Sequence, residues 1–497
     1  MEILEPRYAL PSRQHFTNKA LPAAQKRLRD HIQEKLKDVP AVGFTTDIWS
    51  SSVCPLSLIS FTAQWIDPSF NLQRVTLHTQ DFRGSHTAER VREAIEGMLN
   101  SWGIDKSRVH VIVRDNARNL KKAMDDMEMK SVGCLAHTLQ LAVHDGLLSQ
   151  RSVVDTLATA RKIIGHFKHS PLAYSRLEDI QRELKMDVKR LQQDVQVRWN
   201  SSLYMLQSIL EQKRALLVYS GSYNLPATLT TTQWTLMEKT AEVLVPSEEL
   251  TKDVSMATAS AADVIPAITA LRCLLSKDKT TDQGVKTMKS TLLDAVETRF
   301  AGIEEEPLYS IATLVDPRYK DRYFTHSDNL CIAKDKLIQE VTKIEERAAT
   351  VSEESAAAVA GPSSKKKCQE GSSSLGSILD EILEENPLEG RCVSTSAEVQ
   401  VQTYLMEQPC NRKSNPLQYW KQNASRFPPL ADVAAKFLCA PSTSVDSERL
   451  FSAVSNILDE KRNRLSADRV EMLIFLKKNL HLILPEYDVE SESGDEE

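Results

Sequence analysis

Apolar positions in the first third of the chain change their period in a regular order. Val42–Phe44, Leu56–Ala63 and Leu72–His78 carry short apolar or alternating runs, which predict three strands. Between Ala88 and Trp102 the apolar residues recur every three or four positions, so this segment is predicted to form an amphipathic helix. The nearly all-apolar run Val109–Val113 predicts a fourth strand, buried on both faces.

A second alternation of helix and strand follows. Leu120–Met129 is predicted to form a short helix, Ser131–Leu135 a fifth strand and His137–Leu147 a further helix. The order is thus three strands, helix, strand, helix, strand, helix, which is typical of a mixed α/β layer. A ribonuclease H-like fold has this order and places its first strand beside its fourth.

The rest of the chain is helical in pattern apart from one low-complexity stretch. Residues 151–350 carry helical periodicity almost throughout, whereas 351–376 are rich in Ala, Gly, Ser and Lys and predict a disordered linker. Helical spacing then returns. The predicted units are an N-terminal helical segment (1–40), the first part of the α/β core (41–150), an all-helical insertion (151–350), the linker (351–376), a C-terminal region that completes the core (377–485) and an acidic tail (486–497).

Composition narrows the class of protein. The length of 497 residues predicts about three units, at roughly 150 residues each. With 41% hydrophobic and 26% charged residues and no long apolar run, we expect a soluble protein rather than a membrane protein. The first residues lack the pattern of a secretory signal, which favours an intracellular location. The eight cysteines include no close pair typical of a zinc ribbon or a redox motif.

Charge is distributed unevenly. The formal net charge of −6 comes from residues 486–497, which hold seven acidic residues and no basic one, so the remaining chain is close to neutral. Arg151–Arg214 contains twelve Lys and Arg against seven Asp and Glu. This local excess is either a nucleic-acid-binding surface or a solvated helical face.

Three carboxylates far apart in sequence are candidate metal ligands. Asp47 and Asp115 each follow an apolar strand run, and Glu448 lies three residues before Phe451 in a segment with helical spacing. Two strand-end aspartates and a helical glutamate favour a two-metal phosphoryl-transfer site. The alternative interpretation is a strand-end cap or turn residue for each aspartate and an ordinary surface charge for the glutamate.

Six motifs in order resemble the hAT-superfamily transposases and their relatives, the zinc finger BED domain-containing proteins. The resemblance covers nearly the whole chain. The motifs are Thr45–Trp49, Arg114–Asn119, Cys134–His137, Arg198–Ser201, Leu314–Lys320 and the region from Asn415 to Leu480. Each motif is weak alone, and the ordered set is specific.

The resemblance implies a ribonuclease H-like core, interrupted by a large helical insertion and followed by a C-terminal hAT dimerisation region. It assigns Asp47, Asp115 and Glu448 to a catalytic acidic triad that would hold Mg²⁺ or Mn²⁺. It also places His137 and Arg198 against DNA phosphates. Trp199 would stack on a flipped base. For His137 and Trp199 the alternative is an ordinary place in the core.

The resemblance also implies partners. We expect DNA, a second copy bound through 415–480 and a nuclear location, although the apolar helices of that region could instead close the chain's own core. Lys365–Lys367 is a minimal import signal or a solvated run, and His481–Pro485 is a SUMO-binding strand or a helix end. No zinc finger pattern precedes Asp47, and Cys134 with His137 lacks a second ligand pair, so no structural zinc is expected.

Three functions remain open on these grounds. The first is a nuclear DNA-binding protein, derived from a transposase, that acts in transcription or chromatin regulation. The second is an active transposase that cleaves and joins DNA with Mg²⁺. The third is a scaffold that recruits chromatin or SUMO-linked partners. The intact acidic residues favour the second and the missing finger pattern favours the first, so enzymatic activity is left uncertain.

Overall fold

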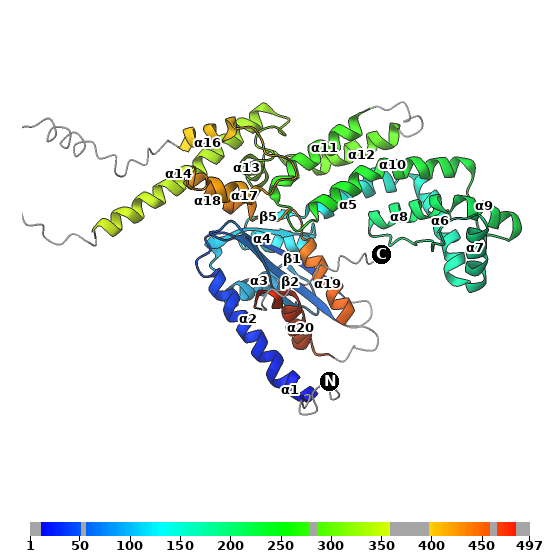
Figure 1. Cartoon of the computed structure of the whole chain (residues 1–497), viewed down its shortest axis with the longest axis horizontal. Coiled ribbons are helices and arrows are strands. Elements are labelled where there is room, and N and C mark those ends of the chain that lie inside the picture. The colour runs from blue at the N-terminus through cyan, green and yellow to red at the C-terminus, as the bar shows by residue number, and fades with distance from the viewer. Residues whose placement is uncertain (1–10, 51–55, 278–285, 358–396, 458–464, 484–497) are drawn as a thin grey trace, which may run out of the picture.

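A five-stranded mixed sheet forms the centre of the computed structural model, which describes residues 11–50, 56–277, 286–357, 397–457 and 465–483 (Figure 1). The strand order is β3-β2-β1-β4-β5, antiparallel from β3 to β1 and parallel from β1 to β5. The predicted α/β layer and the placement of the first strand beside the fourth are therefore confirmed. The strands are β1 (Val42–Ser50), β2 (Ser57–Ile66), β3 (Leu72–Asp81), β4 (Val109–Arg114) and β5 (Ser131–Gly133).

Strand β1 is longer than its apolar run predicted. Its antiparallel pairing with β2 continues to Ser50, opposite Ser57, although its parallel pairing with β4 ends at Thr45, opposite Val113. Asp47 therefore lies inside a strand and not at its end. The prediction failed because polar residues continue the ladder after the apolar run stops.

Helices cover the face of the sheet that carries Phe44 and Phe61, whose rings stack with centroids 4.7 Å apart. The helices on this face are α2 (Leu21–Leu36), α3 (Ala88–Trp102) and α4 (Arg118–Asp126). Helix α3 begins after Thr87, whose side chain accepts a hydrogen bond from the amide of Arg90. It ends at Gly103, whose φ of 66° suits a residue without a Cβ atom.

Two C-terminal helices, α19 (Val445–Ile457) and α20 (Ala467–Asn479), complete the core. Helix α19 packs on β1 and β2, and α20 packs along β3. The side-chain amide of Asn479 donates to the carbonyl of Thr76 at 2.8 Å and accepts from its N–H at 2.9 Å. The chain thus returns to the sheet at its end, as Figure 1 shows.

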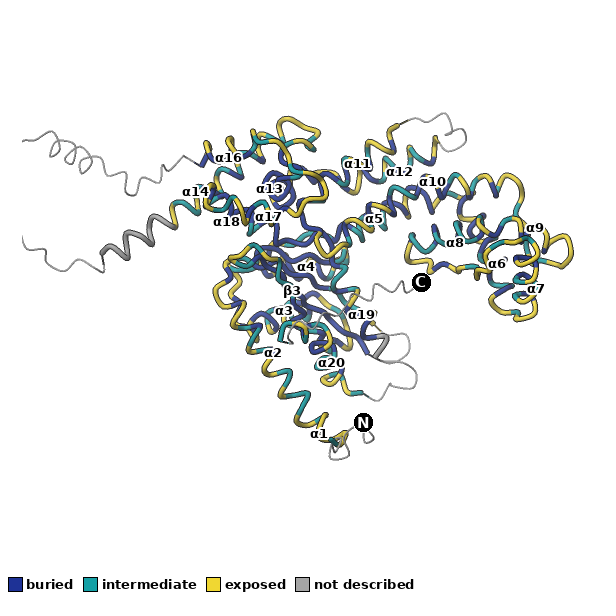
Figure 2. Tube along the Cα trace, viewed as in Figure 1, coloured by how far each residue is buried: buried dark blue, intermediate teal, exposed yellow. Residues whose placement is uncertain are grey.

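Every described element between residues 151 and 357 is a helix. Figure 1 shows α6 to α9 as a lobe set apart from the sheet, and Figure 2 shows that much of the surface of this lobe is exposed. The helices are α6 (Arg151–His169), α7 (Pro171–Glu183), α8 (Trp199–Glu211), α9 (Lys213–Ser222), α10 (Thr231–Val254), η4 (Ala261–Asp263), α11 (Val264–Ser276), α12 (Lys286–Arg299), α13 (Pro307–Val315) and α14 (Ser327–Ala357).

Helix α14 continues to Ala357, so the first residues of the predicted linker are helical. The remainder of that linker, with Lys365–Lys367, lies outside the described residues, as does the acidic tail. Leu480–Leu482 form a 3-10 turn directly after α20, in keeping with the interpretation of this segment as a helix end. No described helix combines the length and apolar character needed to cross a membrane.

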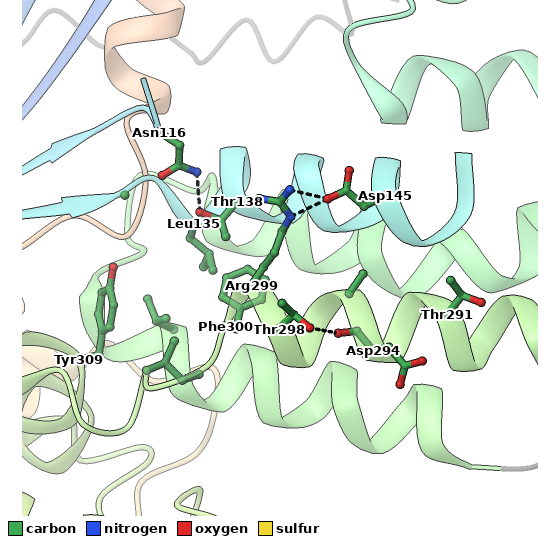
Figure 3. A pocket seen from close by; sticks show the side chains of 14 residues that line it. Asn116, Leu135, Thr138, Asp145, Thr291, Asp294, Thr298, Arg299, Phe300 and Tyr309 are labelled. Carbon is green, nitrogen blue, oxygen red and sulfur yellow. Dashed lines mark hydrogen bonds and ion pairs between the residues drawn. The ribbon is translucent and has the colours of Figure 1, made fainter. Parts of the chain in front are cut away.

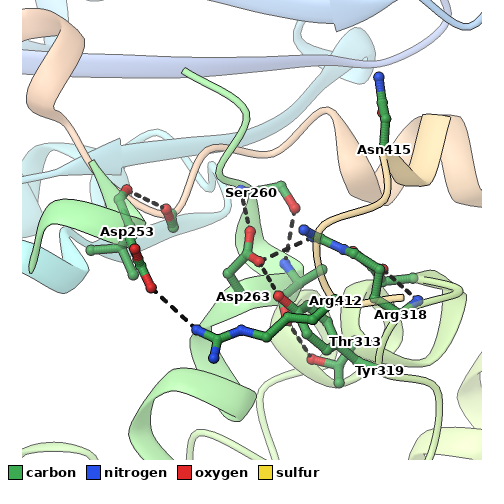
Figure 4. A network of polar contacts seen from close by, with 12 residues as sticks. Asp253, Ser260, Asp263, Thr313, Arg318, Tyr319, Arg412 and Asn415 are labelled. Atoms are coloured by element: carbon green, nitrogen blue, oxygen red, sulfur yellow. Dashed lines mark hydrogen bonds and ion pairs between the residues drawn. The ribbon is translucent and has the colours of Figure 1, made fainter. Parts of the chain in front are cut away.

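The segment that follows α13 joins the insertion to the C-terminal helices α16 (Ala397–Met406), α17 (Pro416–Asn423) and α18 (Pro428–Leu438). Lys320 is 1% exposed, and its ammonium donates to the carbonyls of Tyr404 at 2.6 Å and Glu407 at 2.9 Å. Nearby, Arg318 pairs with Asp316 and reaches Asp263 at 3.1 Å (Figure 4). The motif Leu314–Lys320 therefore has a structural role, because it bonds the segment after α13 to α16 and to the residue that follows α16.

Candidate functional site

Asp47 lies in β1 and Asp115 directly follows the neighbouring parallel strand β4, so both lie at the same edge of the sheet. The β1–β4 pairing ends at Thr45 and Val113, and each aspartate comes two residues after one of these partners. An Asp47 carboxylate oxygen accepts from the amide of Ile48 at 2.8 Å, and one of Asp115 accepts from that of Ala117 at 3.0 Å. The second hydrogen bond positions Asp115 in the turn before α4.

Glu448 is placed over this edge by hydroxyl contacts between strands and helix. In the first turn of α19, the Ser447 hydroxyl contacts that of Thr45 at 2.8 Å, and Thr45 in turn contacts that of Thr62 at 2.6 Å. Further along α19, the ring of Phe451 stacks on Trp49 with centroids 5.9 Å apart. Glu448 follows Ser447 directly, so its backbone is fixed against β1.

Electrostatics link the three carboxylates. Burial raises the pKa of Asp47 most, the charges of Asp115 and Glu448 add to the rise, and the hydrogen bond from the Ile48 amide opposes it, so that the pKa is about 7. The charges of both other carboxylates therefore act on Asp47. The structure therefore brings Asp47, Asp115 and Glu448 into one electrostatic environment, although 333 residues separate the second from the third in the sequence.

The donor chemistry of this environment suits a hard divalent cation, because carboxylate oxygens are the ligands that Mg²⁺ and Mn²⁺ prefer. A cation would also relieve the repulsion that raises the pKa of Asp47. Among the described residues, however, no three His, Cys, Asp or Glu side chains stand close enough together to hold a metal ion. The carboxylates are neighbours, but they do not form a coordination shell in this conformation.

Residues 439–444 connect α18 to α19, the helix that carries Glu448, and are buried in the core. The carbonyl of Cys439 accepts from the side-chain amide of Gln64 at 2.6 Å, and the carbonyl of Ser442 accepts from the amide of Leu135 at 3.1 Å. A Cβ atom at Gly43 would lie 2.9 Å from the Cys439 carbonyl, so only glycine fits there without a shift. These contacts position α19.

The motif Cys134–His137 holds the same segment. The Cys134 thiol is fully buried and accepts from the amide of Ser444 at 3.3 Å. This contact accounts for the cysteine without a metal. His137 is half-buried in the first turn of α5 (Leu135–Val143).

The structure places Trp199 in the helical core and not at an exposed rim. Its side chain is 1% exposed, and its amide donates to the side chain of Gln140 at 2.9 Å. A base therefore cannot stack on this indole. The helical spacing of Trp199 with Leu203 and Leu206 was the sequence signal for a core position. Arg198, just before α8, is exposed and remains available to a phosphate.

A cavity of about 840 Å³ opens between α5 and α12 (Figure 3). Asn116 lines it and donates from its amide to the hydroxyl of Thr138 at 3.0 Å. On the opposite wall, Arg299 pairs with Asp145, 154 residues away in the sequence. Sequence reasoning missed this cavity because its walls come from such distant segments.

Comparisons with known proteins match this architecture. Residues 45–140 match a ZBED1 RNase-like domain, 132–243 a ZBED1 RNase-like helical domain, and 400–480 the hAT family C-terminal dimerisation region.

Similar proteins include human zinc finger BED domain-containing protein 4, 29% identical over 98% of this chain and 42% of its own length. Human zinc finger BED domain-containing protein 6 is also 29% identical, over 98% of this chain and 53% of its own. A putative AC transposase of Zea mays is 25% identical over 94% of this chain and 61% of its own length. The chain spans about half the length of these relatives.

Proposed function

Since the chain belongs to the hAT transposases and their zinc finger BED domain-containing relatives, we propose that it is a transposase-derived, nuclear DNA-binding protein. It pairs with a second copy through the C-terminal region and acts in transcription or chromatin regulation. DNA and a second copy of the chain are its partners.

The observation that carries this proposal is the contact between Ser447 and Thr45. It joins the dimerisation region to the sheet edge that bears Asp47 and Asp115. A dimer formed through that region therefore presents two such edges in a fixed relation to one another, which suits two positions along a DNA duplex. Exposed cations such as Arg198 then supply phosphate contacts.

The proposal is tested by the binding of the purified chain to a short fluorescent duplex across a salt series. We expect affinity to fall steeply with salt, because phosphate contacts release counterions. Arg198→Gln should weaken binding and flatten the salt dependence, whereas Lys421→Gln, an exposed lysine on α17, should not. Absence of duplex binding at low salt, or a monomer by sedimentation at micromolar concentration, would contradict the proposal.

A second candidate function is metal-dependent DNA cleavage. It is favoured by the raised pKa of Asp47, to which burial contributes most and the charges of Asp115 and Glu448 also contribute, because a divalent cation would relieve the repulsion between the carboxylates. Bound Mg²⁺ would activate a water or 3′-hydroxyl and stabilise charge in an in-line displacement at phosphorus. Asp47, Asp115 and Glu448 are the residues that would hold it, and the contact of Ser447 with Thr45 keeps the backbone of Glu448 against β1.

Cleavage is tested with duplex ends in Mg²⁺ or Mn²⁺. Nicking that is lost in Asp47→Asn, and retained in Asp126→Asn on the exposed side of α4, would establish the enzyme. Equal nicking by both variants would assign the activity to a contaminant. Salt-dependent binding without nicking would support the DNA-binding role and contradict the cleavage function.

A further inference from the structure

A cluster of cations from β3, α19 and α20 surrounds one carboxylate in the first turn of α19. Asp446, in the first turn of this helix, pairs with Arg74 of β3 at 3.4 Å and with Arg449 at 3.7 Å. Lys478 of α20 lies close enough to Asp446 and Arg449 to be affected by both charges. We call Arg74, Arg449 and Lys478 the cationic cluster.

Among the described residues, one carboxylate is shared by three cations: Asp446 pairs with Arg74 and Arg449, and its charge also acts on Lys478. Lys477 adds a fourth positive charge beside Lys478. A purely structural ion-pair network would match its charges, because uncompensated cations repel one another.

The pKa shifts of Arg74 and Lys478 reflect burial and the nearby positive charges. Burial lowers the pKa of Arg74. The charge of Asp446 acts to raise this pKa, and the charge of Arg449 acts to lower it. Burial also lowers the pKa of Lys478, followed by the charge of Lys477. The Arg74 Nε is buried and has no hydrogen-bond partner among the described residues. Arg74 therefore keeps a donor that no described residue uses.

The side chains remain accessible to an anion. In the pairs with Asp446, the side chain of Arg74 is 25% exposed and that of Arg449 is 52% exposed. Arg449 also donates to the carbonyl of Ser255 at 3.0 Å, which holds its guanidinium in place. An anion meets a partly desolvated, pre-positioned group of donors, which strengthens charge-assisted hydrogen bonds.

The cationic cluster is rigidly linked to the carboxylates. Arg449 follows Glu448 directly, and Ser447 between Asp446 and Glu448 is fixed to Thr45. A DNA strand near Asp47 and Glu448 would meet two negative groups that repel its phosphates. The cations of the cluster, which include the neighbouring Arg449, offset this repulsion and fix the register of the backbone.

We propose that Arg74, Arg449 and Lys478 form a phosphate anchor, which binds the backbone of a DNA strand as it passes the sheet edge bearing Asp47 and Glu448. This inference deepens the proposed DNA-binding function and rests on it. The anchor contacts backbone phosphate only and reads no base. Its removal therefore weakens binding equally for different sequences.

Four variants test the anchor with a short fluorescent duplex of either of two unrelated sequences. Lys478→Gln and Arg449→Gln should each weaken binding about 5- to 10-fold at low salt and reduce the slope of log affinity against log salt by about 0.9 per lost contact. Asp446→Asn should tighten binding, because it removes the competing carboxylate. Lys421→Gln, an exposed lysine on α17, is the matched control and should bind as the parent chain does.

The expected changes in duplex affinity have opposite signs, which separates loss of a phosphate contact from misfolding. A damaged fold would not tighten binding in one variant while weakening it in another. Thermal unfolding confirms that each variant is folded. If the parent chain binds duplex but Lys478→Gln and Arg449→Gln bind like Lys421→Gln, the anchor is wrong and the proposed function stands. If the parent chain binds no duplex, both fail.

Discussion

Ser447 and Thr45 touch through their hydroxyl oxygens, 2.8 Å apart, although 402 positions separate them in the chain. Both are almost fully buried, at 0% and 1% exposure. This contact joins the last part of the chain to the first strand. It therefore determines whether Glu448 reaches the edge that holds Asp47.

Removing this contact should destabilise the fold. Ser447→Ala leaves the Thr45 hydroxyl with one partner fewer in a buried site, so we expect a loss of about 1–2 kcal/mol in the free energy of unfolding. Urea titration measures it. Ser452→Ala, at an exposed position of α19, should change stability by less than about 0.5 kcal/mol. Equal effects of the two variants would show that the contact has no energetic role.

The raised pKa of Asp47 predicts a distinctive pH dependence. Because its folded pKa of about 7 exceeds its unfolded value, the native state binds the extra proton, and this contribution to stability is full below about pH 4 and is lost as pH rises toward 7. Asp47→Asn removes this loss. The difference in free energy of unfolding between Asp47→Asn and the parent chain should therefore be more favourable to the variant at pH 8 than at pH 4, by roughly 1–2 kcal/mol.

Unfolding of both proteins across this pH range measures the effect. Asp126→Asn is the control, because this exposed carboxylate on α4 should leave the pH profile unchanged. A parallel shift of the parent and Asp47→Asn curves at every pH would contradict the raised pKa. Mg²⁺ should also stabilise the parent chain more above pH 7 than below it, if the carboxylates bind the ion.

Gly43 offers a test of the buried segment 439–444. Gly43→Ala puts a Cβ atom 2.9 Å from the backbone carbonyl of Cys439, and a carbonyl in a packed core cannot move freely, so we expect a loss of about 1–3 kcal/mol. Gly97→Ala in α3 meets no atom within 4 Å and should instead stabilise by about 0.5–1 kcal/mol. Thermal denaturation distinguishes the two signs.

Lys320 should matter for stability more than for DNA. Lys320→Met removes two donors and leaves the carbonyls of Tyr404 and Glu407 without them, at a cost of about 1–3 kcal/mol. Duplex affinity of the folded variant should stay unchanged, because this buried ammonium cannot reach a phosphate. Lys421→Met, at an exposed site, should alter neither quantity. A selective loss of DNA binding in Lys320→Met would contradict the structural role.

The sequence predicted the sheet well because apolar runs mark buried strands directly. It also predicted that Asp47 would lie near Asp115, since that follows from the β1–β4 adjacency. It did not show that β1 continues through Asp47, because the continuation depends on pairing with β2. Trp199 was placed at the surface by family resemblance, whereas its own helical spacing indicated the core. The cationic cluster could not be foreseen, since Arg74, Arg449 and Lys478 gather around Asp446 only after β3, α19 and α20 have packed.

The buried residues 439–444 have a consequence for how the chain is made. The ribosome must add 396 residues after Gly43 before Gly43 can meet Cys439, so the face of the sheet opposite Phe44 and Phe61 stays uncovered while those residues are made. Contacts of such long sequence separation form slowly, and exposed strands invite aggregation in the meantime. A product truncated within the helical insertion would therefore fail as a folded protein, and not merely as a dimer.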